Sequence, residues 1–230
     1  MSSGELADAT IVFDLDGTLV DTAPDLVRAL NETLDLEGLP RAKLDVVRTL
    51  VGQGARVLIE RSAGLSGVNF STERLSQLTA AFIEFYRADI ARDSVVFEGV
   101  ADALDALAGL GAKFAVCTNK RTDLSVQLLE ALDLAQRFSA IVGADAVTDR
   151  KPHPDHYRAA VTRAGGVVRR SLMVGDTAAD VAAARGAGAP VAVVAFGYSH
   201  GGAEQLSADA LLHHYSELAP VSRRLLAARP

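Results

Sequence analysis

Two aspartates, Asp14 and Asp16, stand directly after a short apolar run at residues 11–13. On an extended chain, side chains two positions apart point the same way, so the two carboxylates would lie close together and repel each other. Each would then need a cation or a proton nearby, as in a nucleophile that stands beside a general acid or base. An acidic turn closed by Gly17 is the purely structural alternative.

Five further polar residues are candidates for the same chemistry. The Thr118 hydroxyl and the backbone around Asn119 could hold phosphate oxygens, although both residue types also favour helix N-termini. Lys151 lies in a loop with two prolines, which would present its ammonium in a fixed place unless it is an ordinary surface lysine. Asp176 and Asp180 offer the oxygen ligands that suit Mg²⁺, or they only compensate the charge of a helix N-terminus.

Short apolar runs alternate with helical patterns along most of the chain. The runs lie at residues 11–13, 114–117, 140–143, 172–175 and 191–194. Between them, hydrophobic residues recur at the spacing of one helix face. Strands that alternate with helices predict an α/β fold with a Rossmann-like parallel sheet, in which chemistry collects at the carboxyl ends of the strands.

The stretch 22–95 breaks this alternation, because it contains helical patterns and no convincing strand. Leucine and aromatic side chains recur there at helical spacing. We therefore expect a discontinuous core domain at 1–21 and 96–230, with a helical cap domain at 22–95 inserted after the first strand. Hinges between the two are expected near residues 21–22 and 95–98.

Together, these groups resemble the four motifs of the haloacid dehalogenase superfamily of phosphotransferases. The matching positions are Asp14-x-Asp16-Gly17-Thr18, Thr118, Lys151 and Gly175-Asp176-x-x-x-Asp180. The resemblance implies that Asp14 attacks phosphorus to form an aspartyl phosphate. Asp16 would protonate the leaving alcohol and then activate water. Because Asp16 is present, the resemblance favours phosphate transfer over carbon–halogen hydrolysis.

The same resemblance implies Mg²⁺ as the cofactor. The ion would lie on the side chain of Asp14, the main-chain carbonyl of Asp16 and the side chain of Asp176. Asp180 would assist from nearby, and Thr118 and Lys151 would hold the phosphoryl oxygens. Electrostatics also requires such cations, because an anionic nucleophile and an anionic phosphate repel each other and positive charge offsets that repulsion.

The segment 51–61 resembles the cap segment of phosphoglycolate phosphatases. Gly52 and Gly54 would let backbone N–H groups approach a small carboxylate, and Arg56 would pair with it. Asn119 follows Thr118 as in that family and is a further candidate for substrate binding. The implied reaction is hydrolysis of 2-phosphoglycolate to glycolate and phosphate. A tight turn between two cap helices is the structural alternative for the two glycines.

Other functions remain open on the sequence. The substrate could be another small ester, such as a sugar phosphate, or pyrophosphate. A phosphomutase would retain the aspartyl phosphate and shield it from water. A non-catalytic phosphate-binding module could use the same fold, although none of the motif residues is missing.

The composition limits the partners and the location. A formal net charge of -6 argues against nonspecific binding of nucleic acid or anionic membranes. The single cysteine, Cys117, and the absence of a signal peptide or a membrane-length apolar run favour the cytoplasm. The choice between a monomer and a homodimer stays open. Lys120 and Arg121 are expected to be solvated, and the five histidines are expected to have no special role.

Overall fold

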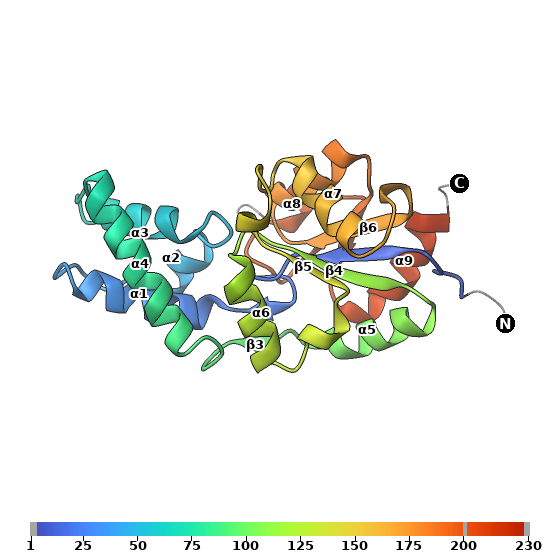
Figure 1. Ribbon diagram of the computed structural model, residues 1–230, viewed down its shortest axis with the longest axis horizontal. Coiled ribbons are helices and arrows are strands. Elements are labelled where there is room, and N and C mark those ends of the chain that lie inside the picture. Colours follow the sequence, from blue (N-terminus) through green and yellow to red (C-terminus); the bar gives the residue numbers. More distant parts are fainter. Residues whose placement is uncertain (1–3, 200–201, 228–230) are drawn as a thin grey trace.

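A six-stranded, fully parallel sheet forms the centre of the molecule (Figure 1). The computed structural model describes residues 4–199 and 202–227. In sheet order, the strands are β5 (Ala140–Val142), β4 (Lys113–Cys117), β1 (Thr10–Phe13), β6 (Ser171–Gly175), β7 (Val191–Val194) and β8 (Ala210–Leu212). The predicted α/β fold is therefore confirmed. The sequence analysis missed β8, a three-residue strand between polar segments.

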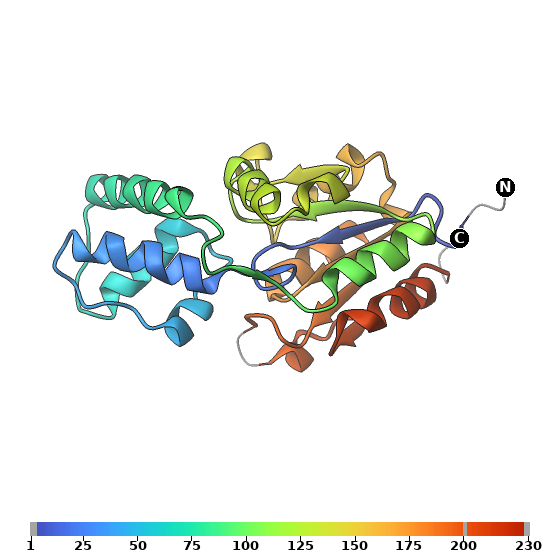
Figure 2. The same ribbon diagram turned by 90° about the horizontal axis from the view of Figure 1, so that it is seen from below.

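Helices cover both faces of the sheet, as the view in Figure 2 shows. One face carries α7 (Pro154–Arg163) and α8 (Ala178–Ala187). The other carries α5 (Val100–Gly109), α6 (Thr122–Ala131) and α9 (Leu218–Ala227). Ile11 and Phe13 on β1 are buried in the layer with α5 and α9, whereas Val12 is buried in the layer with α7 and α8. Burial on both faces explains why β1 has an uninterrupted apolar sequence.

Short 3₁₀-helices lie in the connections of the described chain. They are η1 (Ala135–Arg137), η2 (Ala144–Ala146), η3 (Val168–Arg170), η4 (Ala203–Leu206) and η5 (Tyr215–Glu217). Among the residues described, none of the helices combines the length and the hydropathy that a membrane crossing requires.

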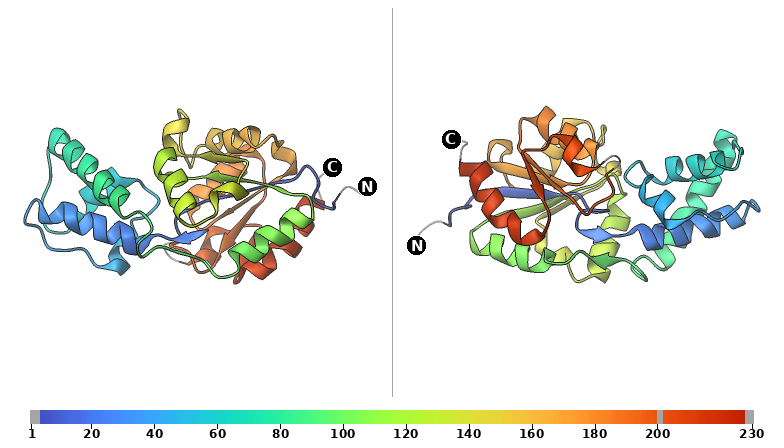
Figure 3. Two further views of the ribbon diagram at one scale, coloured as in Figure 1. Left: turned by 60° about the horizontal axis from the view of Figure 1, so that its bottom comes forward. Right: turned by 180° about the vertical axis from the view of Figure 1, so that it is seen from behind.

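Four helices lie apart from the sheet at one end of the molecule (Figures 1 and 3). They are α1 (Ala23–Asp35), α2 (Leu44–Arg48), α3 (Ala55–Gly64) and α4 (Thr72–Ala88). α4 packs against both α1 and α3. Pro24 occupies the first turn of α1, where a missing N–H costs nothing. The helices occur within the stretch predicted as the cap, while the boundaries of that domain stay a prediction.

A two-stranded antiparallel ribbon joins the four helices to the sheet. It consists of β2 (Val20–Asp21) and β3 (Val95–Val96), with Val20 opposite Val96. Both crossings of the chain between the two parts thus run side by side (Figure 2). The sequence showed no strand here, because two residues are too few to form a pattern. The predicted hinges fall at this ribbon, and their motion stays a prediction.

Candidate active site

The carboxyl ends of β4, β1 and β6 lie next to one another, because Phe13 is in register with both neighbouring strands. Asp14, Thr118 and Asp176 follow these three strands directly. The chain leaves β1 on one side for β4 and β5 and returns on the other side at β6. Loops diverge at such a switch point and leave a crevice. Here a cleft opens between the sheet edge and the cap helices, and Asp14, Asp16 and Thr118 line it.

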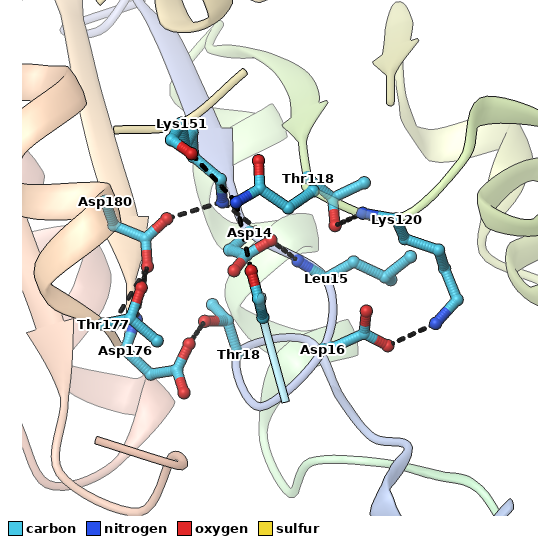
Figure 4. A network of polar contacts seen from close by, with 12 residues as sticks. Asp14, Leu15, Asp16, Thr18, Thr118, Lys120, Lys151, Asp176, Thr177 and Asp180 are labelled. Atoms are coloured by element: carbon cyan, nitrogen blue, oxygen red, sulfur yellow. Dashed lines mark hydrogen bonds and ion pairs between the residues drawn. The ribbon is translucent and has the colours of Figure 1, made fainter. Parts of the chain in front are cut away.

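Lys151 lies at the centre of a buried charge cluster (Figure 4). Its Nζ is 2.9 Å from Oδ1 of Asp14 and 2.6 Å from Oδ1 of Asp180. The side chain of Lys151 is only 1% exposed, so these ion pairs are shielded from water. Asp14 Oδ1 also accepts a hydrogen bond of 2.7 Å from the backbone N–H of Leu15. The structure thus brings Asp14, Lys151 and Asp180 together as the sequence analysis expected.

Asp180 has two structural tasks at once. Its Oδ2 accepts hydrogen bonds from the N–H and the hydroxyl of Thr177, at 3.0 and 2.7 Å, and closes the capping box of α8. Its Oδ1 pairs with Lys151. Asp180 therefore lies in the first turn of α8, as the structural alternative expected, and its part in a metal site stays a prediction. With both oxygens engaged, Asp180 is suited to orient Lys151.

Asp176 is completely buried and held by two donors. The hydroxyl of Thr18 donates to its Oδ1 at 2.9 Å, and the N–H of Tyr198 donates to its Oδ2 at 2.7 Å. Gly17 allows this approach. It has φ +82°, and a Cβ there would lie 2.5 Å from Asp176 Oδ2. The glycine in the first motif is therefore needed for space as well as for the turn.

One cation faces three carboxylates in this cluster. Oxygens of Asp14, Asp176 and Asp180 all lie within 4.8 Å of one another. Burial raises the pKa of Asp14 to about 6, although Lys151 acts in the opposite direction. Burial and the charge of Asp180 also raise the pKa of Asp176. Burial would lower the pKa of Lys151, but Asp14 and Asp180 outweigh it and raise the value.

The cluster fits a divalent metal ion. Its negative charge exceeds what Lys151 alone can balance, and its available donors are hard carboxylate oxygens. Mg²⁺ prefers such oxygens and needs only one or two carboxylates from the protein. Asp14 and Asp176 are the candidates for direct ligands. The two partners of Asp176 are neutral donors that leave its charge unbalanced, whereas Asp180 pairs with the Lys151 ammonium and caps α8.

Asp16 lies on the other side of the cleft and pairs with Lys120. The Lys120 ammonium is 2.7 Å from Asp16 Oδ1, which also accepts a 2.7 Å hydrogen bond from the Thr22 hydroxyl. The expectation that Lys120 is solvated is therefore wrong, since its side chain is 6% exposed. The loop after β4 turns it inward under Tyr86 of α4. Its neighbour Arg121 is half exposed, as expected.

Asn119 connects the sheet to the cap. Its side-chain amide donates to the carbonyl of Gly52 at 3.1 Å and to the carbonyl of Lys151 at 3.0 Å. Gly52 and Gly54 both line the cleft, and Gly54 is the N-cap of α3 with φ +94°. These three residues therefore lie where the sheet edge meets the four helices α1 to α4, and their contact with substrate stays a prediction.

The structure does not bring Arg56 to the cleft. Its side chain is exposed and donates to the Ser76 hydroxyl on α4 at 3.2 Å. Ala55 and Leu58, three residues apart on α3, line the cleft instead. Successive helical residues are rotated by about 100°, so Arg56 falls on another side of the helix. The expected carboxylate contact of Arg56 is thus corrected.

His156 holds the backbone of Lys151 by a hydrogen bond, a contact that the sequence analysis missed. It is completely buried, and its Nδ1 accepts from the backbone N–H of Lys151 at 3.1 Å. Nε2 must then carry the proton and donate to the carbonyl of Val142 at 3.0 Å. Burial lowers the pKa of His156 to about 4, so the ring is neutral. No pattern in the sequence marks this role, because both partners are backbone groups.

Comparisons with known proteins agree with this geometry. The model of the family "Haloacid dehalogenase-like hydrolase" matches residues 11–194. A phosphoglycolate phosphatase from Caulobacter vibrioides is 46% identical over 98% of this chain and 95% of its own. One from Agrobacterium fabrum is 43% identical over 91% of this chain and 90% of its own.

A solved structure extends the agreement to three dimensions. It is described as a predicted phosphoglycolate phosphatase from Haemophilus somnus. It superimposes with a TM-score of 0.87 at 28% identity, over 94% of this chain and 98% of its own. The chain therefore belongs to the haloacid dehalogenase-like hydrolase family, within which it resembles the phosphoglycolate phosphatases and is a phosphoric monoester hydrolase.

Proposed function

We propose that this phosphatase hydrolyses 2-phosphoglycolate to glycolate and phosphate through a covalent intermediate on Asp14. One observation carries the proposal. The buried Asp14 carboxylate, which pairs with Lys151, lines the same cleft as Asp16 and Thr118. A nucleophile with a cation beside it and a proton donor would thus face one cleft. The relatives named phosphoglycolate phosphatase support the choice of substrate.

In the first step, a carboxylate oxygen of Asp14 attacks phosphorus, and the bond from phosphorus to the ester oxygen breaks. Asp16 gives its proton to that oxygen, so glycolate leaves as the alcohol. In the second step, Asp16 takes a proton from water, whose oxygen attacks the phosphorus of the aspartyl phosphate. Phosphate departs and the Asp14 carboxylate is restored.

The remaining residues position the phosphoryl group and neutralise its charge. The Thr118 hydroxyl and the Lys151 ammonium would hold the phosphoryl oxygens during both steps. Mg²⁺ would be held by Asp14, Asp176 and the main-chain carbonyl of Asp16. When bound, it supplies positive charge that offsets the repulsion between the nucleophile and the phosphate.

We also infer that residues 22–95 act as a cap that closes over the substrate. The hydrogen bond from Asn119 to Gly52 supports this, because it joins the sheet edge to the loop before α3. Closure would keep water away from Asp14 during the first step. In the second step, it would leave room for the single water molecule that attacks the aspartyl phosphate.

The decisive experiment is phosphate release in the presence of Mg²⁺ from a panel of small esters. The panel contains 2-phosphoglycolate, two sugar phosphates and pyrophosphate, and Asp14→Asn is the control. We expect the highest kcat/KM for 2-phosphoglycolate and no release above background from the variant. A higher value for another ester would refute the substrate, and full activity of Asp14→Asn would refute the mechanism.

A further inference from the structure

Lys120 is the one buried ammonium on the leaving-group side of the cleft among the residues described. The sequence has four lysines: Lys43, Lys113, Lys120 and Lys151. Lys43 and Lys113 are exposed, and Lys151 lies in the cluster around Asp14. The chain otherwise uses arginine for its positive charge. Burying a lysine ammonium costs free energy unless anionic or polar partners replace its contacts with water. The ion pair with Asp16 supplies only one such partner.

The ammonium of Lys120 has room for a further acceptor. It carries three N–H donors. One oxygen of Asp16 lies 2.7 Å away, and the ring of Tyr86 lies 4.6 Å away, measured to its centroid. Burial would lower the pKa of Lys120, but the charge of Asp16 outweighs this effect and raises it. The group therefore stays a cation, and it lines the cleft.

The cap contributes an apolar wall to the same space. This wall consists of Leu26, Leu50, Val51, Leu58, Phe82, Ile83 and Tyr86. Among the described cap residues that line the cleft, none carries a charge. A sugar would lose its hydrogen bonds to water there without replacement, which is unfavourable. A two-carbon acid places only one strongly hydrated group in this space.

Arg121 is the other cationic residue that lines the cleft, and it is less suited to the task. Its guanidinium pairs with Asp123 at 3.0 Å, and its side chain is 50% exposed. Screening by water weakens the interactions of such a group. The buried Lys120 is therefore the better partner for a substrate carboxylate.

We propose that Lys120 binds the carboxylate of the leaving group and, with the apolar wall, selects short acidic phosphate esters over neutral esters and sugar phosphates. The inference rests on the proposed function, and it assigns specificity to a residue of the sheet edge in place of Arg56. Because Lys120 lies beside Asp16, a carboxylate held by Lys120 would lie near the residue that exchanges protons with the leaving group.

The test compares 2-phosphoglycolate with ethyl phosphate, in which a methyl group replaces the carboxylate. The variants are Lys120→Met, which keeps length without charge, and Lys120→Arg, which keeps charge. Lys113→Met is the matched control, because Lys113 lies at the opposite end of β4 and is exposed. A charge-assisted hydrogen bond predicts that Lys120→Met lowers kcat/KM for 2-phosphoglycolate by about 10- to 100-fold more than for ethyl phosphate.

The loss should appear mainly in KM for 2-phosphoglycolate, and Lys120→Arg should restore part of the preference. An equal loss of kcat/KM for both esters would overturn the inference, because Lys120 would then act only through its ion pair with Asp16. An unchanged preference would overturn it too. If Lys120→Met does not fold, Lys120→Gln replaces it in the same comparison. The proposed function fails separately, if the unmodified protein shows no preference for 2-phosphoglycolate.

Discussion

The neutral, buried His156 makes the stability of this protein depend on pH in a predictable way. In the unfolded chain, the pKa of histidine is about 6.5. In the folded protein it is about 4, because the buried ring is poorly solvated when charged. Below pH 6.5 the unfolded state therefore binds a proton that the folded state refuses. The stabilisation is complete above that pH and is lost as the pH falls toward 4.

The size of the effect follows from the two pKa values. Between pH 6.5 and pH 4 the free energy of unfolding falls by roughly 3 kcal/mol, and by pH 5 it has fallen by about 2 kcal/mol. Buried carboxyls such as Asp14 have raised pKa values and contribute with the opposite sign. A comparison with a variant that cannot titrate at this position removes their contribution. His156→Gln is suitable, because glutamine is polar and uncharged.

The measurement is urea unfolding, followed by far-UV circular dichroism, from pH 7.5 to pH 5. At pH 7.5 His156→Gln should be the less stable protein, because at least one of the backbone partners of His156 loses its hydrogen bond. The difference from the unmodified protein should shrink by about 2 kcal/mol at pH 5. The control is His213→Gln, since His213 is exposed. A difference that stays constant with pH would show that His156 is not held neutral.

Three further outcomes are expected. Asp16→Asn should lose about 10²- to 10⁴-fold in kcat and should also be less stable, because the buried Lys120 loses its anionic partner. Steady-state assays at a temperature where a thermal melt shows the variant folded would separate the two losses, and full activity there would contradict the role of Asp16. Mg²⁺ should raise the Tm of the unmodified protein, measured by calorimetry, since it binds the folded state. The Tm of Asp176→Asn should rise little with Mg²⁺. An equal rise in both proteins would place the metal elsewhere. Tyr198→Phe removes a hydroxyl that bonds to Asp21 and to the N–H of Ala23, so the free energy of unfolding should fall by about 1–3 kcal/mol; urea unfolding with no change would contradict these contacts.

Local patterns in the sequence predict most of the helices and strands. Each central strand is an apolar run because both of its faces are buried, and each helix that packs on the sheet has an apolar stripe. The strands β2 and β3 escaped prediction because two residues form no pattern, and β8 was missed although it is as long as β5. Their pairing depends on partners far along the chain, so their own residues carry little signal.

The sequence by itself determined which residues could take part in catalysis. Asp14, Thr118 and Asp176 each follow a strand, and parallel strands bring their carboxyl ends to one edge of a sheet. Spacing and residue type therefore sufficed to predict that these side chains meet. Lys151 needed only the added assumption that its loop is stiff.

Only the tertiary structure decided how the remaining charged side chains are used. Lys120 and Arg121 are neighbours in sequence, yet one is buried against Asp16 and the other is exposed. The partner of Lys120 is 104 positions away in the chain, so no local pattern distinguishes the two. Arg56 was misplaced for the same reason, because the side of α3 that faces the cleft is set by packing against other cap helices. Burial and pairing are properties of distant contacts, and these exist only once the chain has folded.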